Sequence, residues 1–313
     1  MAIVAVWFLV LSLPLVLYKS HPYKDVQNVQ IVVFPNASGT TYPAWPPTRE
    51  MLSLIADEQG RVTVVGVNFG YIDMFYNWAR SATNVGLNNI VIVALDDKTY
   101  QVLQSRFPER TLLPSFKVES GFAEFGSVKF KKLTHTRPSF IRAIVDLGFP
   151  VFYIDTDTIM RRNPYQDIER ALMQEPNTTM MVSEDGIPGY YCSCMLHFSC
   201  DESSRSVLKA WETECLNTPD YDDQHALNVV IAEYSILERF HLFVIPESAF
   251  PSGKRTFIKG YDWHRFPDGP TIVHANYMIG HDKKMKALQD RAAWDHKRIL
   301  PVLYNDIEPA RFY

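Results

Sequence analysis

Short hydrophobic runs alternate with helical patterns along the first half of the chain. Residues 61–67 and 89–95 are rich in valine and isoleucine, which is typical of strands buried on both faces. Between them, residues 71–84 carry apolar side chains at helical spacing, and Gly86 is placed to end that helix. A further helix is expected over 96–107, capped by its acidic first residues. This alternation predicts an α/β fold with a mostly parallel, Rossmann-like sheet and flanking helices.

The next strand ends in two carboxylates. A helix over about 138–147, ended by Gly148, leads into four apolar or aromatic residues at 151–154. Asp155 and Asp157 follow, and alternation sets them on the same side of the chain. Open α/β sheets hold their ligands at the carboxyl ends of their strands. Two hard oxygen donors there suit Mg²⁺ or Mn²⁺, although a solvated strand end would show the same residues.

The second half has a looser pattern and no internal repeat or Gly/Ser-rich linker. Helices are expected over 167–174, over 203–215 and from 222 onward, and strands over 180–183, 242–246 and 271–273. A second Asp-x-Asp at 220–222 has no strand before it and is expected to be a turn. The chain is therefore expected to form one catalytic domain over residues 61–313, after a stem and entry segment at 19–60.

Composition excludes some classes of protein. Apolar residues make up 47% of the 313, so a large core is available and disorder is not expected. The net charge of −4, from 31 basic and 35 acidic residues, gives no nucleic-acid footprint, and no nucleic-acid partner is expected.

An uncharged apolar run occupies residues 2–18. A signal anchor over 1–18 is favoured, because the run is long enough for a thin bilayer and no Ala-x-Ala-like cleavage site follows. A cleaved signal peptide is the alternative, and Lys19 and Lys24 argue against the orientation that an anchor needs. The expectation is a single-pass type II Golgi membrane protein with its catalytic domain in the lumen.

Sequons and cysteines agree with a lumenal location. Asn36 and Asn177 each open an Asn-x-Ser/Thr triplet. In an oxidising lumen, the cysteines are expected to form one or two disulfides. A zinc site is the alternative, but the paired C-x-x-C spacing is missing. The four cysteines are Cys192, Cys194, Cys200 and Cys215.

Five short motifs occur in order along the chain. They lie at residues 68–73, 155–157, 222–228, 250–253 and 274–277. The series resembles the nucleotide-diphospho-sugar transferase domain of glycosyltransferase family 77, over roughly residues 62–296. The resemblance implies a GT-A fold, a divalent cation and a nucleotide-sugar donor, with UDP expected. It also implies transfer to a glycan or glycoprotein acceptor with retention of anomeric configuration.

The resemblance implies a cation site. Asp155 and Asp157 match the metal-binding pair, with Asp155 also near the ribose, and His274 matches a ligand from the C-terminal part. Imidazole favours Mn²⁺ over Mg²⁺, so the set predicts manganese. A histidine that merely ends the strand over 271–273 is the alternative.

Residues for the diphosphate and the base are implied in the same way. Gly280 and either Lys283 or Lys284 match the glycine and lysine that meet the diphosphate, although these lysines could form a solvated helix face. A uracil-binding site is implied as well. Ordinary packing is the alternative for its asparagine and its aromatic residues, and an exposed side chain is the alternative for its arginine. Its implied residues are Asn68, Phe69, Tyr71 and Arg137.

Asp223 and Gln224 match the pair that lies beneath the anomeric carbon. Glutamine is a poor nucleophile, so front-face attack assisted by electrostatics is expected. An N-terminal helix cap is the alternative for the acidic residues. His225 replaces an acidic residue of the relatives, and Cys194 stands where many members carry glycine.

Two other functions remain open from the sequence. Asp155 could be the nucleophile of a haloacid-dehalogenase-type phosphatase, although that motif normally follows the first strand of its domain. A sugar-nucleotide binding protein without turnover is the non-enzyme alternative, and it should hydrolyse no donor.

Overall fold

The computed structural model describes residues 45–236, 240–261 and 269–294. The predicted anchor at 1–18 and the stem up to residue 44 lie outside these residues. Within the described ranges, no helix combines the length and the apolar character needed to cross a membrane.

A seven-stranded sheet forms the centre of the described domain, in the order β3-β2-β1-β4-β7-β6-β8. Strands β3, β2, β1 and β4 run parallel, and only β7 runs against its neighbours β4 and β6. The mostly parallel sheet expected from the sequence is therefore confirmed. The strands span β1 Val62–Val67, β2 Ile90–Ala94, β3 Thr111–Leu112, β4 Val151–Ile154, β6 Met180–Ile187, β7 Tyr190–Phe198 and β8 Leu242–Ile245.

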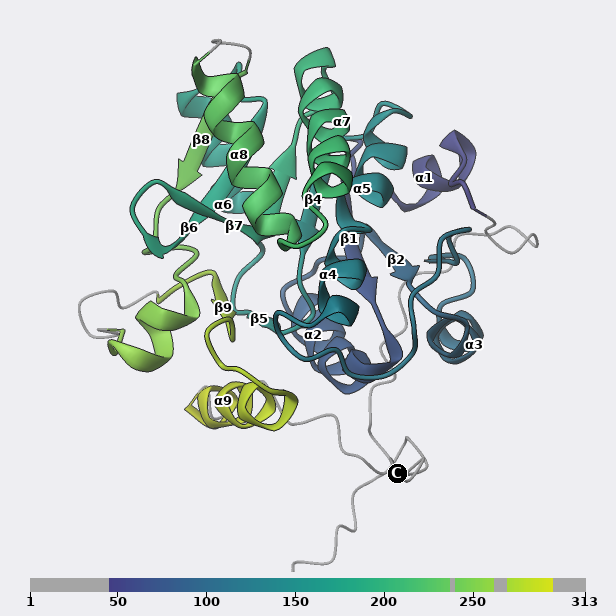
Figure 1. Ribbon diagram of the computed structural model, residues 1–313, viewed down its shortest axis with the longest axis vertical. Helices are drawn as coiled ribbons and strands as arrows, with labels where there is room; N and C mark the ends of the chain where they lie inside the picture. The colour runs from purple at the N-terminus through teal and green to yellow at the C-terminus, as the bar shows by residue number, and fades with distance from the viewer. Residues whose placement is uncertain (1–44, 237–239, 262–268, 295–313) are drawn as a thin grey trace, which may run out of the picture. The chain divides into compact units, whose positions relative to one another are not determined.

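Helices cover both faces of this sheet (Figure 1). Helices α5, α7 and α8 lie on one face and share a core cluster with alternate residues of β1, β4 and β7, while α6 lies on the other face. The helices span α1 Arg49–Ile55, α2 Ile72–Asn84, α3 Asp97–Arg106, α4 Val128–Thr134, α5 Arg137–Val145, α6 Tyr165–Gln174, α7 Glu202–Asn217, α8 Asp223–Ile236 and α9 His281–Trp294. A 3₁₀ turn, η2 Phe69–Tyr71, and a π-helical turn, η3 Lys254–Ile258, complete the helical elements of the described ranges.

Local sequence explains where several helices begin. The side chain of Asp96 accepts a hydrogen bond from the backbone N–H of Thr99 and caps α3, as expected from the sequence. Ser127 and Asp201 cap α4 and α7 in the same way. Gly148, three residues after the end of α5, has a φ of 87°, a conformation that glycine adopts without steric cost and that turns the chain into β4.

A second, two-stranded sheet joins distant parts of the chain. Strand β5, Thr158–Met160, pairs antiparallel with β9, Ile272–His274, and Thr158 lies opposite His274. The chain leaves the main sheet at Asp155, directly after β4, and enters this smaller sheet three residues later. This small sheet therefore fixes the segment after β4 against the C-terminal part of the domain.

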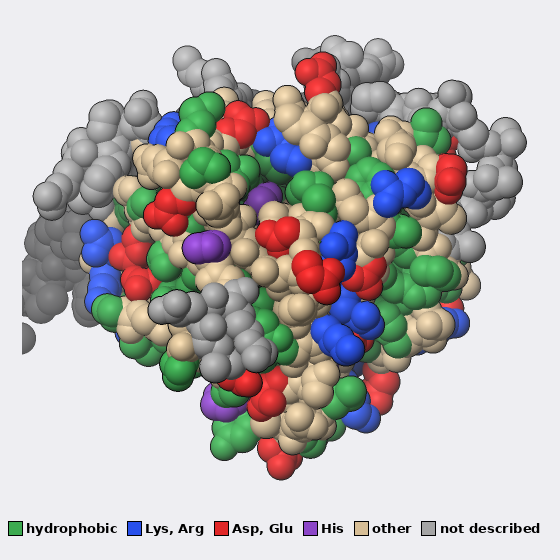
Figure 2. Space-filling model, turned by 90° about the horizontal axis from the view of Figure 1, so that it is seen from above, with side chains coloured by type: hydrophobic (Ala, Val, Ile, Leu, Met, Phe, Trp, Pro, Cys, Tyr) green, Lys and Arg blue, Asp and Glu red, His purple; other side chains and the backbone are tan. Residues whose placement is uncertain are grey.

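Charged side chains of both signs are interspersed over the face seen in Figure 2. Acidic and basic groups alternate there with hydrophobic and other side chains, so neither sign forms a continuous field on this face.

Candidate active site

A group of possible metal ligands lies at the carboxyl end of β4. Asp155 and Asp157 come from the segment between β4 and β5, and His274 ends β9. The Nε2 atom of His274 lies 3.1 Å from Oδ1 of Asp157, and both side chains are buried. One ligand atom from each of the three residues lies within 4.8 Å of the other two. Two carboxylates and an imidazole at this spacing fit a divalent cation such as Mn²⁺.

A lysine side chain lies beside these possible metal ligands. Lys284, in the first turn of α9, forms an ion pair with Oδ2 of Asp157. Burial acts to raise the pKa of Asp157, but Lys284 and His274 outweigh it and hold the pKa well below its ordinary value. Gly280, with a φ of 99°, starts the turn into α9, and its carbonyl accepts from the backbone N–H of Lys284. Lys283 is exposed, so the structure brings Lys284 rather than Lys283 to the ligand group.

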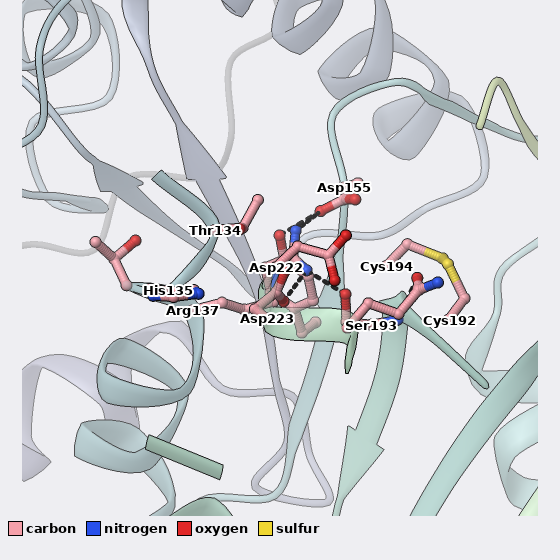
Figure 3. Close-up of polar contacts among 12 residues, drawn as sticks. Thr134, His135, Arg137, Asp155, Cys192, Ser193, Cys194, Asp222 and Asp223 are labelled. Carbon is pink, nitrogen blue, oxygen red and sulfur yellow. Dashed lines mark hydrogen bonds and ion pairs between the residues drawn. A yellow bond between two sulfur atoms is a disulfide. The ribbon is translucent and has the colours of Figure 1, made fainter. Parts of the chain in front are cut away.

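Arg137 connects Asp155, one of the possible metal ligands, to the start of α8 (Figure 3). Its guanidinium donates to Oδ1 of Asp155 at 2.9 Å and also pairs with Asp223 and the hydroxyl of Ser193. The side chain is only 9% exposed, so it is not the exposed arginine of the alternative interpretation. Burial acts to lower the pKa of Arg137, but Asp155 and Asp223 raise it well above its ordinary value, which keeps the guanidinium charged.

Gln224 follows Asp223 in the first turn of α8, and its side-chain amide is held from both ends. Its Nε2 donates to Oδ2 of Asp185 at 2.9 Å, and its Oε1 accepts from the backbone N–H of Ser193 at 3.3 Å. Asp185 also accepts from Nδ2 of Asn276 at 2.7 Å. Burial raises the pKa of Asp185, although the hydrogen bond from Gln224 opposes the shift.

Asp185 is not among the residues predicted from the sequence. It is half-buried and follows the apolar residues at the start of β6, so a carboxylate closing a predicted strand at 180–183 was the available signal. The predicted motif at 250–253 has a packing role in the structure. A Cβ on Gly253 would lie 1.9 Å from the carbonyl oxygen of Asn276, so glycine allows this motif to pack against the motif at 274–277.

The residues predicted for the base lie at the end of β1. Asn68 and Tyr71 line a pocket that they share with Arg137, both motif aspartates and Lys284. The ring of Phe69 is not part of the lining, and Nζ of Lys98 lies 3.8 Å from its centroid. The structure therefore brings together most of the predicted nucleotide residues and leaves Phe69 in the packing beside them.

The segment 118–123 contacts two of the residues predicted for the base. The Nδ2 atom of Asn68 donates to the carbonyl of Glu119 at 2.9 Å, and the hydroxyl of Tyr71 donates to the carbonyl of Ala123 at 2.8 Å. A Cβ on Gly70 would lie 2.2 Å from the backbone nitrogen of Phe122. Glycine at position 70 therefore permits the close approach of two backbones beside the candidate nucleotide site.

One disulfide is present among the described cysteines, joining Cys192 and Cys194 on β7. Cys200 and Cys215 are free. The expectation of one or two disulfides is met by a single bridge between residues two apart, and this bridge lies on the strand that supplies Ser193 to Arg137.

Comparison with known proteins identifies the family. The sequence pattern of the nucleotide-diphospho-sugar transferases matches residues 85–288. The chain belongs to this family. The resemblance to glycosyltransferase family 77 is thereby confirmed, and the predicted enzyme class, a glycosyltransferase, is confirmed with it.

Curated relatives of this transferase are themselves glycosyltransferases. It is 27% identical over 257 residues to UDP-D-xylose:L-fucose alpha-1,3-D-xylosyltransferase 3 of Arabidopsis thaliana, which covers 74% of this chain and 66% of the relative. It is 20% identical over 278 residues to UDP-galactose:fucoside alpha-3-galactosyltransferase of Dictyostelium discoideum, covering 74% of this chain and 42% of the relative. Among solved structures, the galactosyltransferase LgtC in complex with donor and acceptor sugar analogs shares 13% identity and a TM-score of 0.49, over 78% of this chain and 99% of that one.

The family assignment bears on the two alternative functions that the sequence left open. A haloacid-dehalogenase-type phosphatase is not favoured, because the family match includes the segment that carries Asp155 and Asp157. The binding protein without turnover is not favoured either, because the relatives are named as transferases. The roles of the individual site residues remain predictions.

Proposed function

We propose that this chain transfers a pentose, xylose being the first candidate, from a UDP-linked donor to an L-fucoside acceptor, with retention of configuration and with a divalent cation. The observation that carries the proposal is a chain of contacts through Arg137 and Ser193, which joins the Asp155, Asp157 and His274 set to the Asp185–Gln224 pair. The cation set fits a diphosphate, and the amide beside it fits a sugar carbon that becomes positively charged.

The names of the relatives support the choice of sugars. Four relatives from Arabidopsis thaliana are named UDP-D-xylose:L-fucose xylosyltransferases, and the relative from Dictyostelium discoideum is a fucoside galactosyltransferase. Two different donors thus occur with one acceptor sugar. This pattern supports fucose as the acceptor more strongly than it supports xylose as the donor.

The side chains have distinct proposed tasks. The cation, held by Asp155, Asp157 and His274, would neutralise the diphosphate of the donor. Lys284, freed from Asp157 by the cation, would turn to the leaving phosphate in a GT-A arrangement.

Arg137 would hold Asp155 in position on one side of the site, while Asp185 fixes the amide of Gln224 on the other. A fixed amide dipole stabilises developing charge better than a mobile one, because it needs no reorientation during the reaction. We also propose that the catalytic domain lies in the Golgi lumen, behind a membrane anchor at residues 1–18.

The proposal is tested with the oxidised full chain and a panel of UDP-xylose, UDP-galactose and UDP-arabinose. Release of UDP is measured with and without an aryl α-L-fucoside, in Mn²⁺, in Mg²⁺ and in chelator. We expect slow hydrolysis of UDP-xylose in Mn²⁺, faster turnover with the fucoside, and loss of both in chelator. Equal turnover in chelator would overturn the cation site, and no turnover of any donor would overturn the transferase.

A matched pair of variants sharpens this test. Lys284→Ala removes the ion pair with Asp157, whereas Lys283→Ala changes an exposed neighbour in the same helical turn. Only the first variant should lose turnover, and equal effects of the two would remove Lys284 from the proposed mechanism.

A further inference from the structure

The disulfide of β7 is unusual in its position. Cys192 and Cys194 are two residues apart, so their side chains leave the strand on the same side, and both are buried. The bridge encloses a single residue, Ser193, whose hydroxyl contacts Arg137 (Figure 3). Opening this bridge would therefore leave two thiols side by side on β7, which pairs with β6 at Cys192 and accepts the backbone N–H of Asp155 at the carbonyl of Cys194.

A third metal-binding side chain lies next to these sulfurs. One ring nitrogen of His274 and the two Sγ atoms all lie within 4.8 Å of one another. The ring of His274 is buried, and its Nδ1 has no hydrogen-bond partner within the described part of the chain. Buried polar atoms normally find a partner, so an imidazole nitrogen left without one indicates that a further ligand can be accepted there.

We propose that the thiol form of this chain has a second metal site, made by Cys192, Cys194 and His274, that takes Zn²⁺. A dithiol reductant would open the bridge by giving up two electrons and two protons. The reductant becomes a cyclic disulfide, and the two cysteines become thiols. Zinc binding would then release one proton from each thiol, because the thiolate is the ligand. Two thiolates and one imidazole, with a fourth position open, form an established kind of zinc donor set.

The two metal sites differ in chemistry but share one residue. Asp155 and Asp157 give His274 a hard, oxygen-rich environment, whereas the thiols give it a soft one that favours zinc. The disulfide form can therefore offer only the first site. The zinc site stands on its own geometry, and one consequence rests on the proposed function: zinc in the thiol form would draw His274 away from the catalytic cation and lower transfer.

The test compares metal binding by the oxidised chain and by the chain reduced with a phosphine that is then removed without oxygen. Co²⁺ serves as the probe, because thiolate ligands give it a charge-transfer absorption in the near ultraviolet. We expect this band only in the reduced chain, with displacement by Zn²⁺. Zinc affinity should be at least ~100-fold higher in the reduced form, because losing an atom bound to the metal costs more than losing a hydrogen-bond partner of a ligand, which costs about 10–100-fold.

Two double variants assign the ligands. Cys200→Ser with Cys215→Ser should keep the cobalt band, because those free cysteines lie outside the ligand group. Cys192→Ser with Cys194→Ser should abolish it. If the second variant does not fold, alkylation of the reduced wild-type chain replaces it, and Zn²⁺ should protect Cys192 and Cys194.

Absence of the band in the reduced wild-type chain would overturn the zinc site, as would a band that survives loss of both bridge cysteines. Protection confined to Cys200 or Cys215 would overturn it equally. None of these three results bears on the proposed transferase, which is assayed separately by UDP release from the oxidised chain.

Discussion

Substituting His197 by leucine should stabilise the fold, and the gain should increase as the pH falls. His197 is the second-last residue of β7, and it lies opposite Phe152 on β4 and Met181 on β6. It is only 2% exposed, and neither ring nitrogen has a hydrogen-bond partner in the described ranges. An imidazole in this position is desolvated without compensation, at a cost of about 1–3 kcal/mol. Leucine has a similar volume and needs no partner.

The dependence on pH follows from the pKa of this side chain. Burial, aided by the positive charge of Arg61, lowers the pKa of His197 from 6.5 to about 4. Above pH 6.5 both the folded and unfolded chains carry a neutral imidazole, so the pKa shift contributes nothing. Between pH 6.5 and 4 the unfolded chain binds a proton that the folded chain does not, and stability falls by about 1.4 kcal/mol per pH unit. At pH 5 the accumulated loss is about 2 kcal/mol, and leucine removes it.

Urea unfolding of the wild-type chain and of His197→Leu at pH 7.5 and pH 5 measures this effect. The other titrating groups are common to both chains, so their contributions cancel in the difference between the two unfolding free energies. That difference should rise by about 2 kcal/mol on going to pH 5. His241→Leu, at an exposed position, is the matched control and should show no such rise. A difference that is the same at both pH values would refute the argument.

Three further predictions concern catalysis. Asp157→Asn should lower turnover by more than ~100-fold with an unchanged circular dichroism spectrum, because a metal ligand is lost; near-normal turnover at low Mn²⁺ would contradict this. Gln224→Ala should lower kcat by about 100-fold with little change in donor KM, because its proposed partner is charge in the transition state. A raised KM with unchanged kcat would assign it to binding alone. Gly70→Ala should raise donor KM several-fold, because its Cβ would displace the backbone at Phe122; an unaltered KM would separate that segment from the donor site.

The parallel strands could be predicted because they are buried on both faces. Residues 61–67, 89–95 and 151–154 are nearly continuous apolar runs, a pattern that few exposed segments share. Helix α4, Val128–Thr134, gave no such signal, since it is short, rich in lysine and mostly in contact with solvent. Strand β7, Tyr190–Phe198, is also not among the predicted strands, and its antiparallel direction has no sequence signal because an apolar run has the same composition in both directions.

The same difference applies to the candidate site, where the residues within a recognisable pattern could be predicted and the others could not. The pair Asp155 and Asp157 could be located because both follow one recognisable strand, and His274 because a family motif contains it. Asp185 has no motif around it, and its importance arises only where β6 brings it to Gln224. The choice between Lys283 and Lys284 likewise needed the direction of α9, since adjacent helical residues point about 100° apart.

The pairing of β5 with β9 has a consequence for synthesis of the chain. Thr158 lies opposite His274, so the imidazole reaches the two aspartates only when a segment made more than a hundred residues later has docked. All strands of the main sheet precede β9 in the sequence. A ribosome-bound chain can therefore assemble that sheet, with its pair of carboxylates, before His274 has left the exit tunnel. The three side chains can thus meet only after residue 274 has emerged, and a chain cut short before that residue would carry a sheet without the imidazole that lies beside Asp157.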